Sequence, residues 1–475
     1  MGAHPSTLCA RPYFTLIIGA FMSNLPSFIA PIFWGLLLLS VLVFIHEGGH
    51  FLAARACGVR ASEFFLGLPC RFRLAHRSRR CGTLFGITPL LIGGYAAICG
   101  MEHDDSPCAP SVLSEINRCG QASIQEIAKA LDIDSEEALN ACIMLMGWGS
   151  IAPVYAEGDG RSRAYYPETY ATVSRDRMGN TVLDGRAFDK DHATTEGEPW
   201  SGDINGQELF KQEKSRTYDG VSFPRRAFIL LAGILVNIIA GMLLLMSVYS
   251  LIGFTVPQDV NRIGEVIESS PAAEAGIVAG DRIVQIDSVN VNTWTDLVTC
   301  LQEHKQNDSK SSISIVYEHK GKRHTADVML EDGKLGIYAA TEHIKFNIID
   351  SARLSLAYVA QTAAGVAQLL IPTKTMQVLD QSTSIVGISI MSAQAAAAGL
   401  ATFLTFSGLI SLSLGLMNLL PIPPLDGGKL VIEIVQRIRR KEVSVRVQTI
   451  VSYGGIAVFA LLFIYMLRAD ILRFF

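Results

Sequence analysis

The chain has 475 residues, of which 49% are hydrophobic and 18% charged, and its mean hydropathy is positive. This composition is too apolar for an ordinary soluble protein of this length and favours a membrane protein with soluble insertions. The net charge of −4 gives no signal for nucleic acid, and nine scattered cysteines without a CxxC pair predict neither a disulfide framework nor a cysteine zinc site.

Residues 1–27 lack the features of a cleaved signal peptide. Only Arg11 precedes the moderately apolar residues, and no clear small-residue cleavage site follows them. We therefore expect an external leader there, with Met22 as an alternative start of the protein.

Four apolar stretches are long enough to cross a bilayer, which takes about 20 residues. They are residues 28–45, 227–254, 381–425 and 449–467. Basic residues gather after the first stretch, before the second, and between the third and fourth. If the N-terminus lies outside, all three basic clusters face the cytoplasm, as the positive-inside rule prefers. This topology places residues 55–226 inside and residues 257–345 outside.

The first stretch, with its helix predicted at 28–57, runs directly into His46-Glu47-Gly48-Gly49-His50. Residues four apart share one face of a helix, so both imidazoles can bind one metal ion while the glutamate beside them faces water. Such a set with an open coordination position favours catalytic zinc. The alternative is a merely interfacial histidine, but ionisable residues at the end of an apolar span are costly and functional by default.

A third metal ligand is predicted at Asp426, in the sequence NLLPIPPLDGG that begins at Asn418. Three prolines interrupt the span there and free backbone groups that only a protein-lined cavity tolerates. Because the first and third spans run inward in this topology, His46, His50 and Asp426 lie at similar depth. In isolation, Asp426 would instead be interpreted as an interfacial helix cap.

Residues 58–103 contain two β-prone runs that flank a basic turn, followed by Gly93-Gly94. We expect a β-loop here that offers a strand edge to extended substrate, because strand addition holds an unwound peptide well. A hairpin that only packs on the first helix is the alternative.

Residues 104–173 carry three short helical patterns, with N-cap residues at Ser123 and at Asp134 or Ser135, and then two apolar runs. This order resembles a winged helix-turn-helix. Residues 174–222 are polar and glycine-rich, which predicts a flexible linker.

The same insertion is acidic. Between residues 104 and 219 the chain has 21 acidic and 11 basic residues. Since DNA affinity depends on basic side chains that neutralise phosphates, we expect a cytoplasmic protein-binding or regulatory module and no nucleic-acid binding. An insertion that merely packs on the membrane domain is the alternative.

Residues 257–343 read as strand, short helix, turn and strand, which resembles a PDZ domain. A groove near residues 263–266 would bind peptide or limit the size of a substrate, and we favour the size filter. Beyond it we expect an amphipathic connector at 344–380, a third transmembrane region at 381–436 and a fourth helix within 447–475.

The combination of HEGGH on a first span, NLLPIPPLDGG on a later one and a PDZ-like segment between them resembles the site-2 protease family of intramembrane zinc metalloproteases. Within that family it resembles the bacterial regulator-of-sigma-E-protease branch. The resemblance covers about residues 22–102 and 225–475. Both motifs are specific in combination.

This resemblance implies roles for single residues. It makes Glu47 the general base and gives Zn²⁺ three ligands, which are His46, His50 and Asp426. It further implies substrate contacts at Asn418, Asn237, Gly93 and Gly94. The chain departs from the family at positions that are not ligands, and these are Ile234 in place of a proline, Lys429 in place of a frequent histidine, and Ser384-Ile385 in place of Gly-Pro.

The predicted fold is therefore a polytopic α-helical membrane protein with about four transmembrane helices, a membrane-associated β-loop, an extracytoplasmic PDZ-like α+β domain and a cytoplasmic winged-helix-like insertion. The predicted activity is zinc-dependent proteolysis, within a bacterial cytoplasmic membrane, of single-span proteins such as anti-sigma factors or signal-peptide remnants. A catalytically inactive membrane scaffold is the alternative. A metal transporter is disfavoured because it needs neither the PDZ-like segment nor the LDGG break.

Overall fold

The computed structural model of the chain describes residues 29–474 except 71, 102–105, 156–165, 308–311, 331–333 and 442. The chain divides into two compact units. One comprises residues 1–245 and 355–475, and the other comprises residues 246–354. The predicted leader and the alternative start at Met22 lie outside the described residues.

Four described helices are long and apolar enough to cross a membrane, and each overlaps one of the predicted apolar stretches. They are α2 (Ile29–Ala56), α7 (Phe223–Ser247), α13 (Leu400–Met417) and α15 (Val445–Phe474). A fifth crossing is added if α10 (Ile348–Gln368) and α11 (Pro372–Gln381), bent by 118° at the break between them, form one span. These two helices, α10 and α11, occupy the region that was predicted from the sequence as an amphipathic connector.

The predicted third transmembrane region consists of three helices. Between α12 (Ile385–Ala397) and α13, Gly399 has a φ of 115°, a conformation that favours glycine. The proline-rich turn after α13 leads into α14 (Asp426–Arg439). Asp426 is therefore the first residue of a helix that closely follows a membrane helix.

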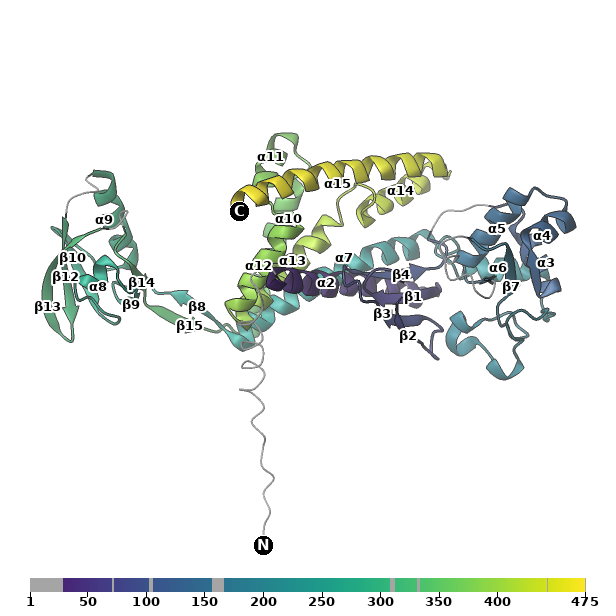
Figure 1. Ribbon diagram of the computed structural model, residues 1–475, viewed down its shortest axis with the longest axis horizontal. Coiled ribbons are helices and arrows are strands. Elements are labelled where there is room, and N and C mark those ends of the chain that lie inside the picture. The colour runs from purple at the N-terminus through teal and green to yellow at the C-terminus, as the bar shows by residue number, and fades with distance from the viewer. Residues whose placement is uncertain are drawn as a thin grey trace, which may run out of the picture. The chain divides into compact units, whose positions relative to one another are not determined.

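A four-stranded sheet packs on α2, as Figure 1 shows. Its strands are β1 (Ala61–Leu66), β2 (Leu74–Arg77), β3 (Leu84–Ile87) and β4 (Gly94–Ile98), in the spatial order β2-β3-β1-β4. The two predicted β-prone runs form β1 and β3, which pair in parallel and not as a hairpin. Among the described strands β4 pairs with β1 alone, so it is an edge strand.

The insertion after this sheet has a hydrophobic core of its own. Its first part comprises α3 (Ala109–Cys119), β5 (Gln121–Ser123), α4 (Ile124–Leu131), α5 (Ser135–Gly147), β6 (Ile151–Val154) and β7 (Thr169–Thr172). The strands form a sheet in the order β5-β7-β6. Ser123 and Asp134 accept hydrogen bonds from the first turns of α4 and α5, which confirms both predicted N-caps.

The prediction of a flexible linker at 174–222 is wrong. The segment contains the 3-10 helices η2 (Val182–Ala187) and η3 (Lys190–His192) and the helix α6 (Gly206–Ser215). Leu209 of α6 is 1% exposed within the core of the insertion. The polar composition was misleading because the polar side chains satisfy one another in a buried network.

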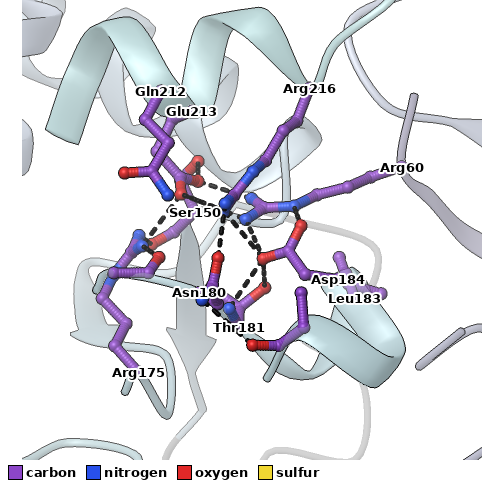
Figure 2. Close-up of polar contacts among 12 residues, drawn as sticks. Arg60, Ser150, Arg175, Asn180, Thr181, Leu183, Asp184, Gln212, Glu213 and Arg216 are labelled. Carbon is purple, nitrogen blue, oxygen red and sulfur yellow. Dashed lines mark hydrogen bonds and ion pairs between the residues drawn. The ribbon is translucent and has the colours of Figure 1, made fainter. Parts of the chain in front are cut away.

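This network, drawn in Figure 2, joins the insertion to the segment between α2 and β1. Arg60 is 1% exposed and donates to Asp184 Oδ1 from Nε at 2.7 Å and to Glu213 Oε2 from Nη1 at 2.6 Å. Glu213 also accepts from Arg175 Nη1 at 2.9 Å and from the Ser150 hydroxyl. Burial alone would raise the pKa of Glu213, but the two guanidinium groups outweigh burial and lower that pKa below its usual range. Ion pairs therefore fix the insertion beside the end of a membrane helix.

The second unit is built around a sheet with the order β11-β10-β12-β13 and two strand pairs. In chain order its elements are the π-helical turn η4 (Val248–Ile252), β8 (Phe254–Pro257), β9 (Ile263–Val266), α8 (Pro271–Glu274), β10 (Arg282–Ile286), β11 (Val289–Asn290), α9 (Trp294–Asn307), β12 (Ser312–His319), β13 (Lys322–Met329), β14 (Ile337–Ala339) and β15 (Thr341–Ile344). The predicted strand, short helix and strand are β9, α8 and β10. The PDZ assignment stays a prediction.

Replacing Arg60 with alanine should lower the stability of the protein by about 3–5 kcal/mol, because Glu213 and Asp184 then remain buried with too little positive charge. Thermal unfolding of the purified protein in detergent measures the loss. Arg118→Ala is the matched control, since Arg118 on α3 is 70% exposed and, among the described residues, forms an ion pair with Glu115 alone, three residues earlier. Equal changes in the two variants would show that the network contributes no more than a surface ion pair.

Candidate metal centre

Three side chains that are far apart in the sequence converge on one point. His46 Nε2 lies 3.0 Å and His50 Nε2 lies 3.1 Å from the same oxygen, Oδ2 of Asp426, and the two nitrogens are 3.2 Å apart. The three ligand atoms all lie within 4.8 Å of one another. Both histidines are buried, at 6% and 4% exposure.

The tautomer of His50 makes this cluster suitable for a cation. His50 Nδ1 lies 2.7 Å from the carbonyl oxygen of Ile229, which can only accept a hydrogen bond. Nδ1 therefore carries the proton of the neutral ring, and the lone pair of Nε2 faces His46 and Asp426. Two nitrogen donors and one carboxylate oxygen fit zinc with a further coordination position left open.

Asn237 lies behind His46 and is fully buried. Its Nδ2 is 3.4 Å from His46 Nδ1, while its Oδ1 has no hydrogen-bond partner among the described atoms. The two ends of an amide are nearly equivalent in shape, and turning this amide over would place the oxygen where it accepts from Nδ1–H. That orientation would fix the His46 ring with Nε2 free to bind a metal ion.

Two glycines let α2 and α7 approach closely enough to place His50. A Cβ atom on Gly49 would lie 2.6 Å from the carbonyl oxygen of Ala232, and one on Gly233 would lie 2.3 Å from His50 Nε2. Neither distance is sterically allowed for real atoms. The second glycine of HEGGH and the glycine of α7 therefore have a packing role that the motif pattern did not reveal.

Asp426 is held at the start of α14 by the turn before it. Gly427 N donates to the Asn418 carbonyl at 2.7 Å, and Asn418 Nδ2 lies 3.4 Å from His46 Nε2. A Cβ atom on Gly428 would lie 2.3 Å from Pro423 N, so the turn also requires glycine there. The proline and glycine residues of NLLPIPPLDGG thus bring one carboxylate and one amide to the histidines.

Glu47 follows His46 on α2, is half-buried, and interacts electrostatically with His50, His46 and Asp426. The structure therefore brings together most of the predicted site residues, including Asn237 and Asn418. Gly93 and Gly94 lie elsewhere, at the start of β4 next to Val43 and Phe44 of α2. Their substrate contact stays a prediction. The contact of the Ile229 carbonyl with His50 was missed, because a backbone group leaves no signal in the sequence.

Replacing Gly233 with alanine should weaken zinc binding by about 10–100-fold, the range expected when the support of a ligating histidine is disturbed. The new methyl group would occupy the space of the His50 ring. Zinc titration of the purified protein with a competing chelator measures the affinity. Gly454→Ala on α15 is the control, since a Cβ atom there meets nothing within 4 Å. Unchanged affinity in Gly233→Ala would contradict the close-approach argument.

Comparison with known proteins identifies the family of this chain. The sequence matches the family described as Peptidase family M50 over residues 34–462. Zinc metalloprotease RasP of Shouchella clausii is 26% identical over 469 residues, which are 96% of this chain and 100% of the relative. Regulator of sigma-W protease RasP of Bacillus subtilis is 23% identical over 454 residues, which are 93% of this chain and 98% of the relative. Because the family match spans most of the chain, this protein belongs to peptidase family M50, the site-2 protease family of membrane-embedded zinc metalloendopeptidases.

Proposed function

We propose that this protein cleaves single-span membrane proteins within or beside their transmembrane helices, with His46, His50 and Asp426 as zinc ligands and Glu47 as general base. The convergence of the three ligand atoms, within 4.8 Å of one another beside a membrane helix, is the observation that carries the proposal. Ionisable groups in such a place are expensive to bury and mark a functional site.

Zinc, when bound, polarises the scissile carbonyl and makes water a stronger nucleophile. The Glu47 carboxylate takes the proton from the attacking water and passes it to the nitrogen of the leaving amine. His50 is held by the Ile229 carbonyl and His46 by Asn237, so neither ring has to reorient during the reaction. Asn237 was predicted to contact substrate, but because it is fully buried beside His46 we assign it to positioning that ring. We assign Asn418, at the edge of the cluster, to substrate contact, as predicted.

A helical substrate must be unwound before it is cut, because its carbonyl groups are occupied by backbone hydrogen bonds. The edge strand β4 offers a place where the unwound substrate can bind. Its backbone pairs with β1 on one side, while on the other side the described residues provide one backbone bond, from Tyr218 N to Cys99 O just beyond the strand. An extended segment of the substrate can therefore add to β4 as a further strand.

The substrates are not identified by the site, but one relative suggests a class. The Bacillus subtilis relative is named regulator of sigma-W protease. We propose that substrates here include membrane-anchored anti-sigma factors or signal-peptide remnants, in a bacterial cytoplasmic membrane. Their scissile bond would lie at the cytoplasmic end of the membrane helices, where the basic clusters place the metal ligands.

We propose a winged-helix-like cytoplasmic module at residues 104–173 that binds protein and no nucleic acid. The chain order of three helices with three short strands supports the fold. The helix α5, in the place of a recognition helix, has Glu136 and Glu137 in its first turn and no basic residue. Such a helix repels phosphate.

We propose that the second unit is a PDZ-like extracytoplasmic domain that filters substrates by size. All four predicted catalytic residues lie in the first unit, so removal of the filter leaves the metal ligands and the base in place. A filter of this kind admits proteins that have already lost their outer domains.

Glu47→Gln should bind zinc normally yet lose cleavage by more than about 100-fold, since general-base catalysis contributes that much. Asp426→Ala should lose both zinc and cleavage, because a ligand is removed. Zinc content by elemental analysis and cleavage of a single-span reporter protein in vesicles measure the two properties. Asp426→Asn adds a near-isosteric control for folding.

Full zinc content and activity in Asp426→Ala would show that the third ligand lies elsewhere. Loss of zinc in Glu47→Gln would show that this residue is a ligand and not a base.

Excision of residues 258–340 should widen substrate selection without stopping cleavage. Pro257 of β8 lies directly opposite Thr341 of β15, so an Asn-Gly turn can close that strand pair after the excision. We expect reporters with and without a folded outer domain to be cleaved at similar rates, whereas the intact protein prefers the trimmed one. If a folded, zinc-loaded deletion protein cleaves neither reporter, the size-filter proposal is wrong.

A further inference from the structure

A cavity of about 400 Å³ lies between the edge strand β4 and the helix α5 of the insertion. Ala96, Ala97 and Ile98 line one side of it. Ser62 of the neighbouring strand β1 lines it as well, and its hydroxyl donates to the Ala97 carbonyl at 3.4 Å, so this side of the cavity includes both strands. β4 is the outer strand of this pair, and among the described strands no other strand pairs with its second edge.

The opposite side of the cavity belongs to the insertion. It is formed by the C-terminal part of α5, including Ile143 and Met146, and by Trp148 directly after the helix. Ile143 and Met146 are half-buried apolar side chains that extend from an otherwise acidic segment. Methionine is unbranched and adapts to different apolar partners. The wall therefore suits varied apolar side chains better than one fixed ligand.

The buried ion pairs hold this wall in place. Ser150 lies two residues beyond Trp148, donates to Glu213 from its hydroxyl, and accepts at its carbonyl from Arg175 Nη2 at 2.8 Å. Arg60, one residue before β1, shares Glu213. The end of α5 and the sheet that carries β4 are thus tied to one set of charges, so the width of the cavity is fixed by the fold.

One residue of the cavity wall belongs to the helix that carries Asp426. This residue, Lys429, follows Asp426 by three residues, less than one turn, on α14. Lys429 also interacts electrostatically with Glu47. A peptide that lies between β4 and α5 would therefore lead toward the catalytic groups.

We propose that the insertion is part of the substrate-binding site and forms, with β4, a groove for an extended, apolar segment of the substrate next to the scissile bond. The inference rests on the proposed peptidase function. The edge of β4 supplies backbone hydrogen bonds, while Ile143 and Met146 contact side chains on the other side of the bound strand. The groove thus selects substrates by the sequence beside the cleavage site.

Photocross-linking tests occupancy without cleavage. A benzophenone amino acid is placed at Ile143 in the full-length Glu47→Gln protein in vesicles. The probe is a radiolabelled single-span reporter with a leucine-rich membrane helix and a valine-rich segment on its cytoplasmic side. We expect strong cross-linking to that segment, and several-fold less from Asn140, an exposed position on the same helix outside the cavity. Equal yields at the two positions, or cross-links from position 143 only to lipid or to another protein, would overturn the groove.

Kinetics provide the second test. Ile143→Glu should raise KM for the valine-rich reporter by about tenfold with kcat retained, as loss of one apolar contact does. Asn140→Glu, the same charge at an exposed site, should leave KM unchanged. A reporter with lysines in place of two valines should regain affinity for Ile143→Glu.

The two tests separate the groove from the peptidase. An unchanged KM for Ile143→Glu, in a protein with full zinc content and normal kcat, would refute the groove and leave the peptidase intact. If the wild-type protein cleaves neither reporter, the peptidase proposal is in question, while the cross-linking yield at position 143 still decides whether the groove is occupied.

Discussion

The close approach of α2 and α7 is the constraint on which the catalytic region depends. Gly49 lies against the backbone of Ala232, and Gly233 lies against the His50 ring. At these two points the helices are too close to leave room for a Cβ atom. Only at that distance does the Ile229 carbonyl reach His50 Nδ1. This hydrogen bond turns Nε2 toward His46 and Asp426. Helix packing therefore determines which nitrogen of this proposed metal ligand carries the proton.

A second set of buried charges fixes the position of the insertion relative to α2. Arg60 connects the end of α2 to Asp184 and Glu213 of the insertion, and its pKa is raised because those carboxylates outweigh the effect of burial. The insertion is consequently a rigid neighbour of the β-sheet and not a tethered domain. Its acidic surface and its apolar α5 edge are presented at fixed positions beside β4.

The sequence predicts those features that depend on local patterns. Hydropathy over about 20 residues located four helices, and the four-residue spacing of His46 and His50 placed both on one helix face. The prolines before Asp426 indicated a break that the structure contains. N-caps at Ser123 and Asp134 follow from short-range hydrogen bonding.

Features that depend on distant partners were not predictable in the same way. Arg60 lies 124 and 153 residues from its two carboxylate partners, so the polar segment 174–222 gave no sign of being packed. The parallel pairing of β1 with β3 was hidden for a similar reason, because strand runs do not encode their direction of pairing. Gly233 and the Ile229 carbonyl act through backbone proximity, which composition does not reveal.

The separation of the metal ligands along the chain has a consequence for biosynthesis. Asp426 comes 380 residues after His46, beyond three of the four long apolar helices. HEGGH is therefore synthesised long before the carboxylate, and no product that ends before residue 426 contains the complete proposed ligand set. With the proposed ligand set, a chain that ends before α14 lacks its third ligand, so proteolytic activity requires synthesis beyond the proline-rich turn that follows α13.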